Sequence, residues 1–369
     1  MKKKLLAFVL GTAMVLSLAA CGDTSDAPVA DGVAIEDAAE DSLHFEVIVK
    51  SYQSTYWQAA VQGINQACDE LGVTAHANGP AIESDIADQV NMLDAAIEAA
   101  PDGIGLAACD TTSVLASLQT AMEKGIPVVC FDTGVPAAPE GSVKATVATD
   151  NVAAGACAAE NMYPVIKDKV AAATADAKVR IGEVNQDSTA ANIQERGLGF
   201  VNKMIELITA DGKTVAVVGN EFYVNACVDK GDEATAEVII EVGVPTQTTV
   251  AESTIIASGI MSKADTIAIF GSNQVTAEGI IGANETLNVL GANGIIAAGF
   301  DAGTPQKEAI NAGYFIGSVT QSPLMQGYEC IKTLYAVCKG EEVVDIPMNG
   351  YWYDTTNMTA DNIAPNLYD

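Results

Sequence analysis

The feature that most constrains the fold of this chain is a regular alternation, from Leu43 onward, of short apolar runs with longer amphipathic stretches. The apolar runs are expected to form strands, and the stretches between them repeat apolar residues every three to four positions, as helices do. The first such stretch shows this spacing at Trp57, Val61, Ile64, Cys68 and Leu71, and Gly72 marks the end of the helix. Repeated strand and helix units with uniformly apolar strands predict an α/β fold with parallel sheets.

The apolar runs are numerous enough for two sheets, so we expect two doubly wound parallel-sheet lobes. The segments expected to form strands are 45–49, 73–77, 103–107, 127–131, 145–148, 179–184, 214–218, 266–270, 294–298 and 316–319, with an extra candidate at 237–242. The stretch 222–250 departs from the rhythm and is interpreted as an insertion. It could cover the mouth of a cleft, contact a partner or form a surface excursion.

Length and charge narrow the class of protein. With 369 residues, 49% of them hydrophobic and 18% charged, the chain is long enough for about two domains and too apolar to be disordered. Its formal net charge is −30, and its only basic run lies at residues 2–4. Such a surface repels polyanions, so nucleic acid is not expected as a partner.

The N-terminus has the pattern of an export signal. Three lysines precede the apolar run 5–20, which is too short to span a bilayer and leads into Leu-Ala-Ala-Cys at 18–21. This tetrapeptide resembles the bacterial lipobox, which implies removal of residues 1–20 and a lipid on Cys21, placing the protein at the outer side of the cell membrane. An ordinary signal or an uncleaved anchor is the alternative. Residues 21–42 carry only acidic charges and are interpreted as a flexible tether.

Cysteine and histidine usage gives no sign of a disulfide framework or a metal site. Seven cysteines follow Cys21 without any C-x-x-C pair, and Cys330 and Cys338 would lie about 12 Å apart along one helix. Buried free thiols are therefore expected. His44 and His76 are the only histidines, and neither has a neighbour at ligand spacing, so no metal is predicted.

Common catalytic motifs fail in this sequence. The tripeptide 212–214 resembles the end of a P-loop, but Leu207 stands where the loop needs glycine, and no dinucleotide fingerprint or nucleophile elbow is present. No enzyme activity and no cofactor are expected. Paired carboxylates could still serve a glycosidase, which remains the enzyme alternative.

Polar and aromatic residues follow several of the predicted strands, where ligands collect in open parallel sheets. Aromatic faces stack on the C–H patches of sugars, while carboxylates and amides pair with hydroxyl groups. The residues in such positions are Tyr56, Trp57, Asp132, Asn273, Asp301 and Gln321.

In order and spacing, the segments 51–63, 127–132, 148–151, 195–200, 270–273 and 299–302, together with Gln321, resemble the ribose-binding-protein branch of the type I periplasmic binding proteins. The resemblance implies two lobes joined by three crossings, near residues 149/150, 321/322 and 349/350. The first lobe would comprise 43–149 plus 322–349, and the second 150–321 plus 350–369. Such lobes close on a sugar and present it to an ABC permease.

The same resemblance implies the ligand contacts, each of which has a purely structural alternative. The implied contacts are Tyr56, Trp57, Asp132, Arg196, Tyr223 (or its neighbour Phe222), Asn273, Asp301 and Gln321. Trp57 could simply pack in the core, Arg196 could be an exposed helical charge, and the last three could satisfy loop backbone. The chain has Thr-Tyr-Trp at 55–57 where ribose binders have Pro-Phe-Phe, and Thr133 where they have Arg. Hexoses, pentoses, polyols and signalling furanones therefore all stay open.

We expect a monomeric, lipid-anchored receptor that captures a monosaccharide or small polyol and delivers it to an ABC permease. A sensory receptor with the same lobes is the alternative. A LacI-type repressor shares the lobe architecture, but it needs an N-terminal pair of DNA-binding helices where this chain has an export signal.

Overall fold

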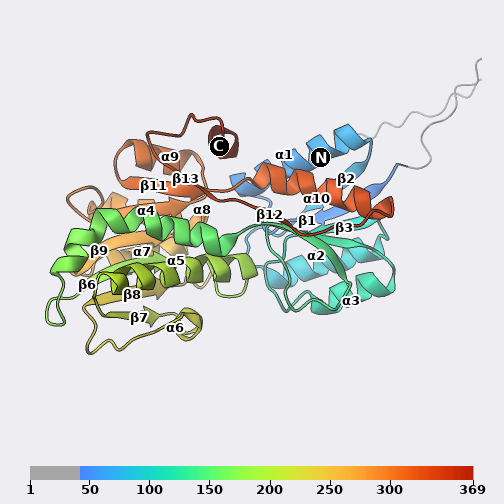
Figure 1. The fold of residues 1–369 in the computed structure, drawn as a ribbon. Coiled ribbons are helices and arrows are strands. Elements are labelled where there is room, and N and C mark those ends of the chain that lie inside the picture. The colour runs from blue at the N-terminus through green and yellow to red at the C-terminus, as the bar shows by residue number, and fades with distance from the viewer. Residues whose placement is uncertain (1–41, 369) are drawn as a thin grey trace, which may run out of the picture. The chain divides into compact units, whose positions relative to one another are not determined.

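The structure is a computed structural model that describes residues 42–368. The predicted signal, the predicted lipidation site Cys21 and the predicted tether up to residue 41 lie outside the described residues. Within the described part, the chain forms two largely parallel sheets, each covered by helices on both faces (Figure 1). The predicted α/β fold is confirmed. We call the two sheets with their helices the first and the second lobe.

The first lobe is built on a six-stranded sheet in the order β12-β5-β4-β3-β1-β2, in which every pairing is parallel. Its strands are β1 (His44–Ile48), β2 (Thr74–Asn78), β3 (Gly103–Leu106), β4 (Val128–Phe131), β5 (Val143–Thr149) and β12 (Ile346–Met348). β3 and β4 are buried along their whole length, because helices cover both sides of the sheet.

Two pairs of helices cover this sheet. Helices α1 (Thr55–Leu71) and α10 (Pro323–Cys338) lie on one face, where Ile64 and Ile331 share a core with Phe45 of β1. Helices α2 (Ile86–Glu98) and α3 (Leu115–Glu123) pack on the opposite face. The helix predicted to end at Gly72 does so, and this glycine has a φ of 66°, which residues with a side chain rarely adopt.

The second lobe is built on a seven-stranded sheet in the order β13-β11-β10-β9-β6-β8-β7. Its strands are β6 (Val179–Val184), β7 (Val215–Gly219), β8 (Val238–Gly243), β9 (Thr266–Gly271), β10 (Ile296–Phe300), β11 (Phe315–Thr320) and β13 (Tyr351–Tyr353). β13 runs antiparallel to β11, and the other pairings are parallel.

Helices also cover both faces of this second sheet (Figure 1). Helices α4 (Asn151–Ala172) and α5 (Ala191–Ala210) lie on one face, and α7 (Val250–Met261), α8 (Gln274–Leu287) and α9 (Thr304–Asn311) on the other. A short helix, α6 (Glu221–Ala226), follows β7. Near the C-terminus of the described chain, residues Ala364–Asn366 form one turn of 3-10 helix.

The interpretation of 222–250 as an insertion is wrong for part of that stretch. β8 lies inside the second sheet, with β6 on one side and β7 on the other. Its sequence is Val-Ile-Ile-Glu-Val-Gly and most of its residues are buried, so it is an interior strand rather than an excursion. The edge position belongs instead to β7.

The chain passes between the two sheets at three places. β5 of the first sheet ends at Thr149, and α4 of the second lobe begins at Asn151. β11 of the second sheet ends at Thr320, and α10 returns to the first lobe. The third crossing lies between β12 of the first sheet and β13 of the second, which are only a few residues apart. The sequence analysis did not predict these two strands.

The described residues offer no membrane span and no metal centre. No helix within residues 42–368 combines the length and apolar character that a bilayer crossing requires. In that same range no group of His, Cys, Asp and Glu side chains has the arrangement of a metal site. The seven cysteines after Cys21 are free thiols, and Cys68, Cys109, Cys130 and Cys330 are buried.

Candidate ligand-binding site

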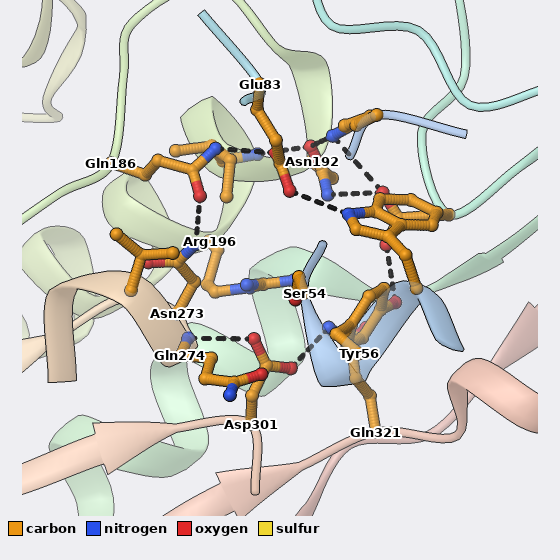
Figure 2. A pocket seen from close by; sticks show the side chains of 15 residues that line it. Ser54, Tyr56, Glu83, Gln186, Asn192, Arg196, Asn273, Gln274, Asp301 and Gln321 are labelled. Atoms are coloured by element: carbon orange, nitrogen blue, oxygen red, sulfur yellow. Dashed lines mark hydrogen bonds and ion pairs between the residues drawn. The ribbon is translucent and has the colours of Figure 1, made fainter. Parts of the chain in front are cut away.

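A pocket lies between the two lobes and is lined by residues from both (Figure 2). Seven of the eight predicted contact residues line it. The lining consists of Lys50, Ser54, Tyr56, Trp57, Glu83 and Asp132 from the first lobe, with Gln186, Asn192, Ile193, Arg196, Asn273, Gln274, Val275, Asp301 and Gln321. Several lie directly after strands, as the geometry of parallel sheets requires.

Asp132 is the most densely bonded carboxylate of the pocket. It follows β4 and has a φ of 61°, a left-handed conformation that aspartate tolerates better than most residues. The Tyr56 hydroxyl donates to its Oδ1 at 2.6 Å, and Asn192 Nδ2 donates to its Oδ2 at 3.0 Å. Lys50 Nζ lies 3.2 Å from Oδ2. Thr133 Oγ1 also donates to Oδ2 at 2.8 Å, so three donors from the first lobe and one from the second meet on one carboxylate.

The ion pair between Lys50 and Asp132 stays charged despite its burial. Burial alone would raise the pKa of Asp132, but Lys50 and the hydrogen bond from Tyr56 outweigh it and lower that pKa. Burial likewise opposes the charge of Lys50, yet the attraction of Asp132 and Glu83 raises its pKa overall. Both shifts favour the charged forms, so the pocket contains a fixed dipole at neutral pH.

Trp57 serves the core and the pocket at once. It is buried on α1 and meets Phe131 edge-to-face, with ring centroids 6.1 Å apart. Its Nε1 donates to Glu83 Oε1 at 2.8 Å, and Gln186 Nε2 of the second lobe donates to Glu83 Oε2 at 2.8 Å. Burial raises the pKa of Glu83 in spite of Lys50 nearby. Glu83 thus joins the wall of one lobe to that of the other.

Arg196 is buried, so its reading as an exposed helical charge is wrong. Its Nε and Nη2 donate to Asn151 Oδ1 at 3.1 and 2.8 Å, and its Nη1 donates to the carbonyl oxygen of Ser272 at 2.9 Å. The guanidinium carbon lies 3.6 Å from the centre of the Phe300 ring. These contacts hold the guanidinium plane rigidly against the pocket.

Asn273 and Asp301 line the pocket while they also satisfy backbone. Asn273 begins α8 and accepts a hydrogen bond from Thr276 N at 3.1 Å, and its Nδ2 donates to Gln186 Oε1. Asp301 follows β10 with a φ of 72° and accepts from Gln274 N at 3.0 Å. Gln321 Nε2 donates to the other oxygen of Asp301 at 2.7 Å. Burial raises the pKa of Asp301, although Arg196 opposes the shift.

Tyr223 does not reach the pocket, and its prediction as a stacking ring is wrong. The ring is fully buried beneath α5, and its hydroxyl donates to the carbonyl oxygen of Asp187 at 2.7 Å. α6 follows the edge strand β7, and a bulky ring there is drawn into the apolar core between β7 and α5. The neighbouring Phe222 meets Tyr223 edge-to-face and lies against the same core.

The sequence prediction missed several polar residues of the pocket. Lys50 and Gln186 each follow a strand, β1 and β6, so the rule that found Asp132 could have found them. Asn192 lies in the first turn of α5, and Glu83 lies in the loop between β2 and α2. At neither position does the local sequence indicate a ligand contact.

Side chains fill most of the space between the lobes. The free volume of the cavity is about 20 Å³, roughly the room that one water molecule needs. Lys50 Nζ donates across the lobes to Asn192 Oδ1 at 2.9 Å, and the Glu83 contact with Gln186 crosses in the same way. A molecule with many hydroxyl groups could take over these hydrogen bonds once the lobes separate.

The two-lobed fold with a pocket between the lobes agrees with a match to a known protein family. The periplasmic binding protein domain family matches residues 45–342, well over half of the chain. The chain belongs to this family. Its members are extracytoplasmic solute-binding proteins rather than enzymes, and the expected absence of catalysis agrees with the family. The resemblance drawn from the sequence is therefore confirmed at the level of the family.

Solved structures of other members of the fold support this assignment. A Brachyspira murdochii protein, described as an ABC transporter and LacI family transcriptional regulator, is 31% identical, with a TM-score of 0.72 and 89% and 99% of the two chains covered. An Agrobacterium vitis ABC transporter solute-binding protein with bound D-fucose is 26% identical, with a TM-score of 0.73 over 88% and 100%. A second Agrobacterium vitis protein, bound to α-D-tagatopyranose, shares the fold at 20% identity, with a TM-score of 0.74 over 89% and 100%. No curated protein matches the chain significantly.

Proposed function

We propose that this protein captures a monosaccharide or a related small polyol between its two lobes and delivers it to an ABC permease. One observation carries the proposal. Buried carboxylates, amides, a guanidinium and an indole from both lobes converge on one pocket at the carboxyl ends of the strands. The D-fucose bound to the Agrobacterium vitis relative supports a sugar as the ligand.

The side chains have the chemistry that sugar hydroxyls require. Asp132 and Asp301 can accept hydrogen bonds from hydroxyl groups, while Arg196 and the pocket amides can donate to hydroxyl oxygens. Trp57 and Tyr56 offer apolar faces and edges to the C–H side of a ring. We include Tyr56, Trp57, Asp132, Arg196, Asn273, Asp301 and Gln321 in the proposed contact set, and add Lys50, Glu83 and Asn192.

Transport requires that binding and lobe closure be coupled. The proposed contacts come from both lobes, so a bound sugar favours the arrangement in which both reach it. We place the lobe boundaries at 149/150, 321/322 and 349/350, where the chain changes from one sheet to the other. Three short crossings restrict the lobes to a hinge motion rather than free tumbling.

The proposal also includes a location and an anchor. Residues 18–21 have the lipobox pattern, so Cys21 would carry a lipid and residues 21–42 would tether the lobes at the outer face of the membrane. In this form the protein acts as a monomer that meets its permease at the membrane surface.

The decisive experiment identifies the ligand directly. Native mass spectrometry of the purified protein is expected to reveal a retained monosaccharide, followed by a thermal-shift panel of D-fucose, D-galactose, D-arabinose and small polyols. A ligand at 100 times its dissociation constant should add about 2.7 kcal/mol of stability. Asp132→Asn is expected to reduce this stabilisation, and Asp88→Asn, an exposed position on α2, is its matched control. If no neutral sugar or polyol stabilises the parent protein, the proposal fails.

A further inference from the structure

A row of four aromatic rings runs from the core of the first lobe past the pocket to the last described residue. Phe131 and Trp57 have centroids 6.1 Å apart, Trp57 and Tyr56 4.9 Å, and Tyr56 and Tyr368 5.8 Å. All three contacts are edge-to-face, with interplanar angles between 78° and 83°. The first three rings belong to the first lobe, and Tyr368 comes from the segment that packs on the second.

The segment before Tyr368 is fixed to the second lobe by polar contacts. Thr320 Oγ1, at the end of β11, donates to the carbonyl oxygen of Asn366 at 2.7 Å. Ala302 N donates to the Tyr368 hydroxyl at 3.3 Å, and Lys307 Nζ donates to the Tyr368 carbonyl oxygen at 3.2 Å. Ala302 directly follows the pocket residue Asp301, so the hydroxyl of Tyr368 lies beside the wall of the site.

Tyr368 therefore packs against both lobes. Its side chain contacts the apolar cluster of the first lobe that contains Tyr56 and Trp57, and the cluster of the second lobe that contains Ala302 and Phe315. Among residues 42–368, no other partly buried hydrophobic side chain packs against the apolar clusters of both lobes.

We propose that Tyr368 is a positioning residue of the binding site and a clamp between the lobes. Its ring fixes the Tyr56 ring, whose hydroxyl donates to Asp132 at 2.6 Å, and its hydroxyl keeps that contact in register with Ala302 of the second lobe. Its role in ligand binding rests on the proposed function, whereas its role as a clamp does not. Tyr368 itself does not line the pocket.

The clamp has a consequence that can be measured without any sugar. Because the Tyr56 ring lies 4.9 Å from Trp57, loss of its support changes the surroundings of that indole. Because the Tyr368 ring joins the two lobes, its loss also favours their separation. The two effects should appear together in a Tyr368→Ala variant, whereas removal of the hydroxyl alone should leave the Trp57 emission unchanged.

The experiment uses the full chain with Trp352→Phe as the parent, so that Trp57 is the only tryptophan. Tyr368→Ala, Tyr368→Phe and the control Tyr314→Ala, an exposed tyrosine of the second lobe, are compared without ligand. Tyr368→Ala is expected to shift the Trp57 emission and to increase the radius of gyration in small-angle scattering. Tyr368→Phe, which keeps the ring, is expected to retain the parent's emission, and Tyr314→Ala to match the parent in both measurements.

The measurements distinguish failure of the clamp from failure of the proposed transport function. If folded Tyr368→Ala keeps either the emission or the radius of gyration of the parent, or if Tyr368→Phe changes the emission as much as the alanine variant does, the clamp is refuted. If Tyr368→Ala does not fold by circular dichroism, Tyr368→Leu, which keeps bulk but no aromatic edge, is measured with the same expectations. A protein that binds no sugar but passes this test keeps the clamp and loses only the transport proposal.

Discussion

Glu183, a residue of β6 in the second lobe, makes stability depend on pH in a direction opposite to that of most carboxylates. Its side chain is fully buried, and neither carboxyl oxygen has a hydrogen-bond partner. Burial raises the pKa of Glu183 well above its usual value. The carboxyl group of Glu183 therefore holds its proton more tightly in the folded protein than in the unfolded chain, where glutamates have a pKa of about 4.3.

The sign of the effect follows from the protons bound in each state. Above about pH 4.3 the unfolded chain has released the proton while the folded protein still holds it, so the free energy of unfolding falls as pH rises. The contribution falls by up to about 1.4 kcal/mol per pH unit until the folded pKa is passed. Glu183→Gln keeps the shape of the side chain without the proton. The free energy of unfolding of Glu183→Gln minus that of the parent should therefore increase with pH at that rate, and it should become constant above the folded pKa of Glu183.

The assay is urea unfolding of the parent and Glu183→Gln at several values from about pH 5 to about pH 8, with the difference in stability plotted against pH. Glu285→Gln, an exposed position on α8, is the control and should show no pH-dependent difference. A constant difference between parent and Glu183→Gln across this range would mean that Glu183 ionises in the folded protein as easily as in water. The reasoning from its unpaired burial would then be refuted.

Further predictions concern the site and the anchor. Asp132→Ala and Arg196→Ala should each weaken sugar binding by about 2 to 4 kcal/mol in titration calorimetry, because each leaves buried partners unpaired, and unchanged affinity in both would displace the proposed site. Adding the cognate sugar should reduce the radius of gyration, with the same midpoint as the change in Trp57 fluorescence; tight binding without compaction would exclude the hinge mechanism. Cys21→Ser should release the protein from membranes in a fractionation assay, and persistent membrane association would contradict lipidation at that residue.

The sequence predicted the fold class and most of the strands because their information is local. Runs such as 103–107 and 127–131 are apolar on both faces, and only a sheet covered on both sides buries them. β12 and β13 were not predicted because each has only three residues, which is too short for such a pattern, and β12 also contains Pro347. Their pairing depends on the crossing that brings them to the sheet edges, which is a tertiary effect.

The same distinction divides the site. Asp132, Asp301 and Gln321 were found because each stands just after a strand, where parallel sheets gather polar side chains. Glu83 was missed because its loop enters the pocket only after the two lobes meet, and Tyr223 was misplaced because a ring after an edge strand can turn into the core. Local pattern locates the edge of a sheet, but it does not show which loops fold over that edge.

The interleaved path of the chain also limits the order in which the protein can fold. The core of the first lobe needs Cys330, Ile331 and Leu334 of α10 beside Phe45 of β1, and its edge needs β12 beside β5. Nearly 300 residues of intervening sequence separate Phe45 from Leu334, and they include the complete parallel core of the second lobe. During synthesis, the lobe that begins first therefore cannot be completed until the parallel strands of the second lobe have emerged. Such long-range closure slows folding, which keeps a chain open for passage through a membrane before its core can form.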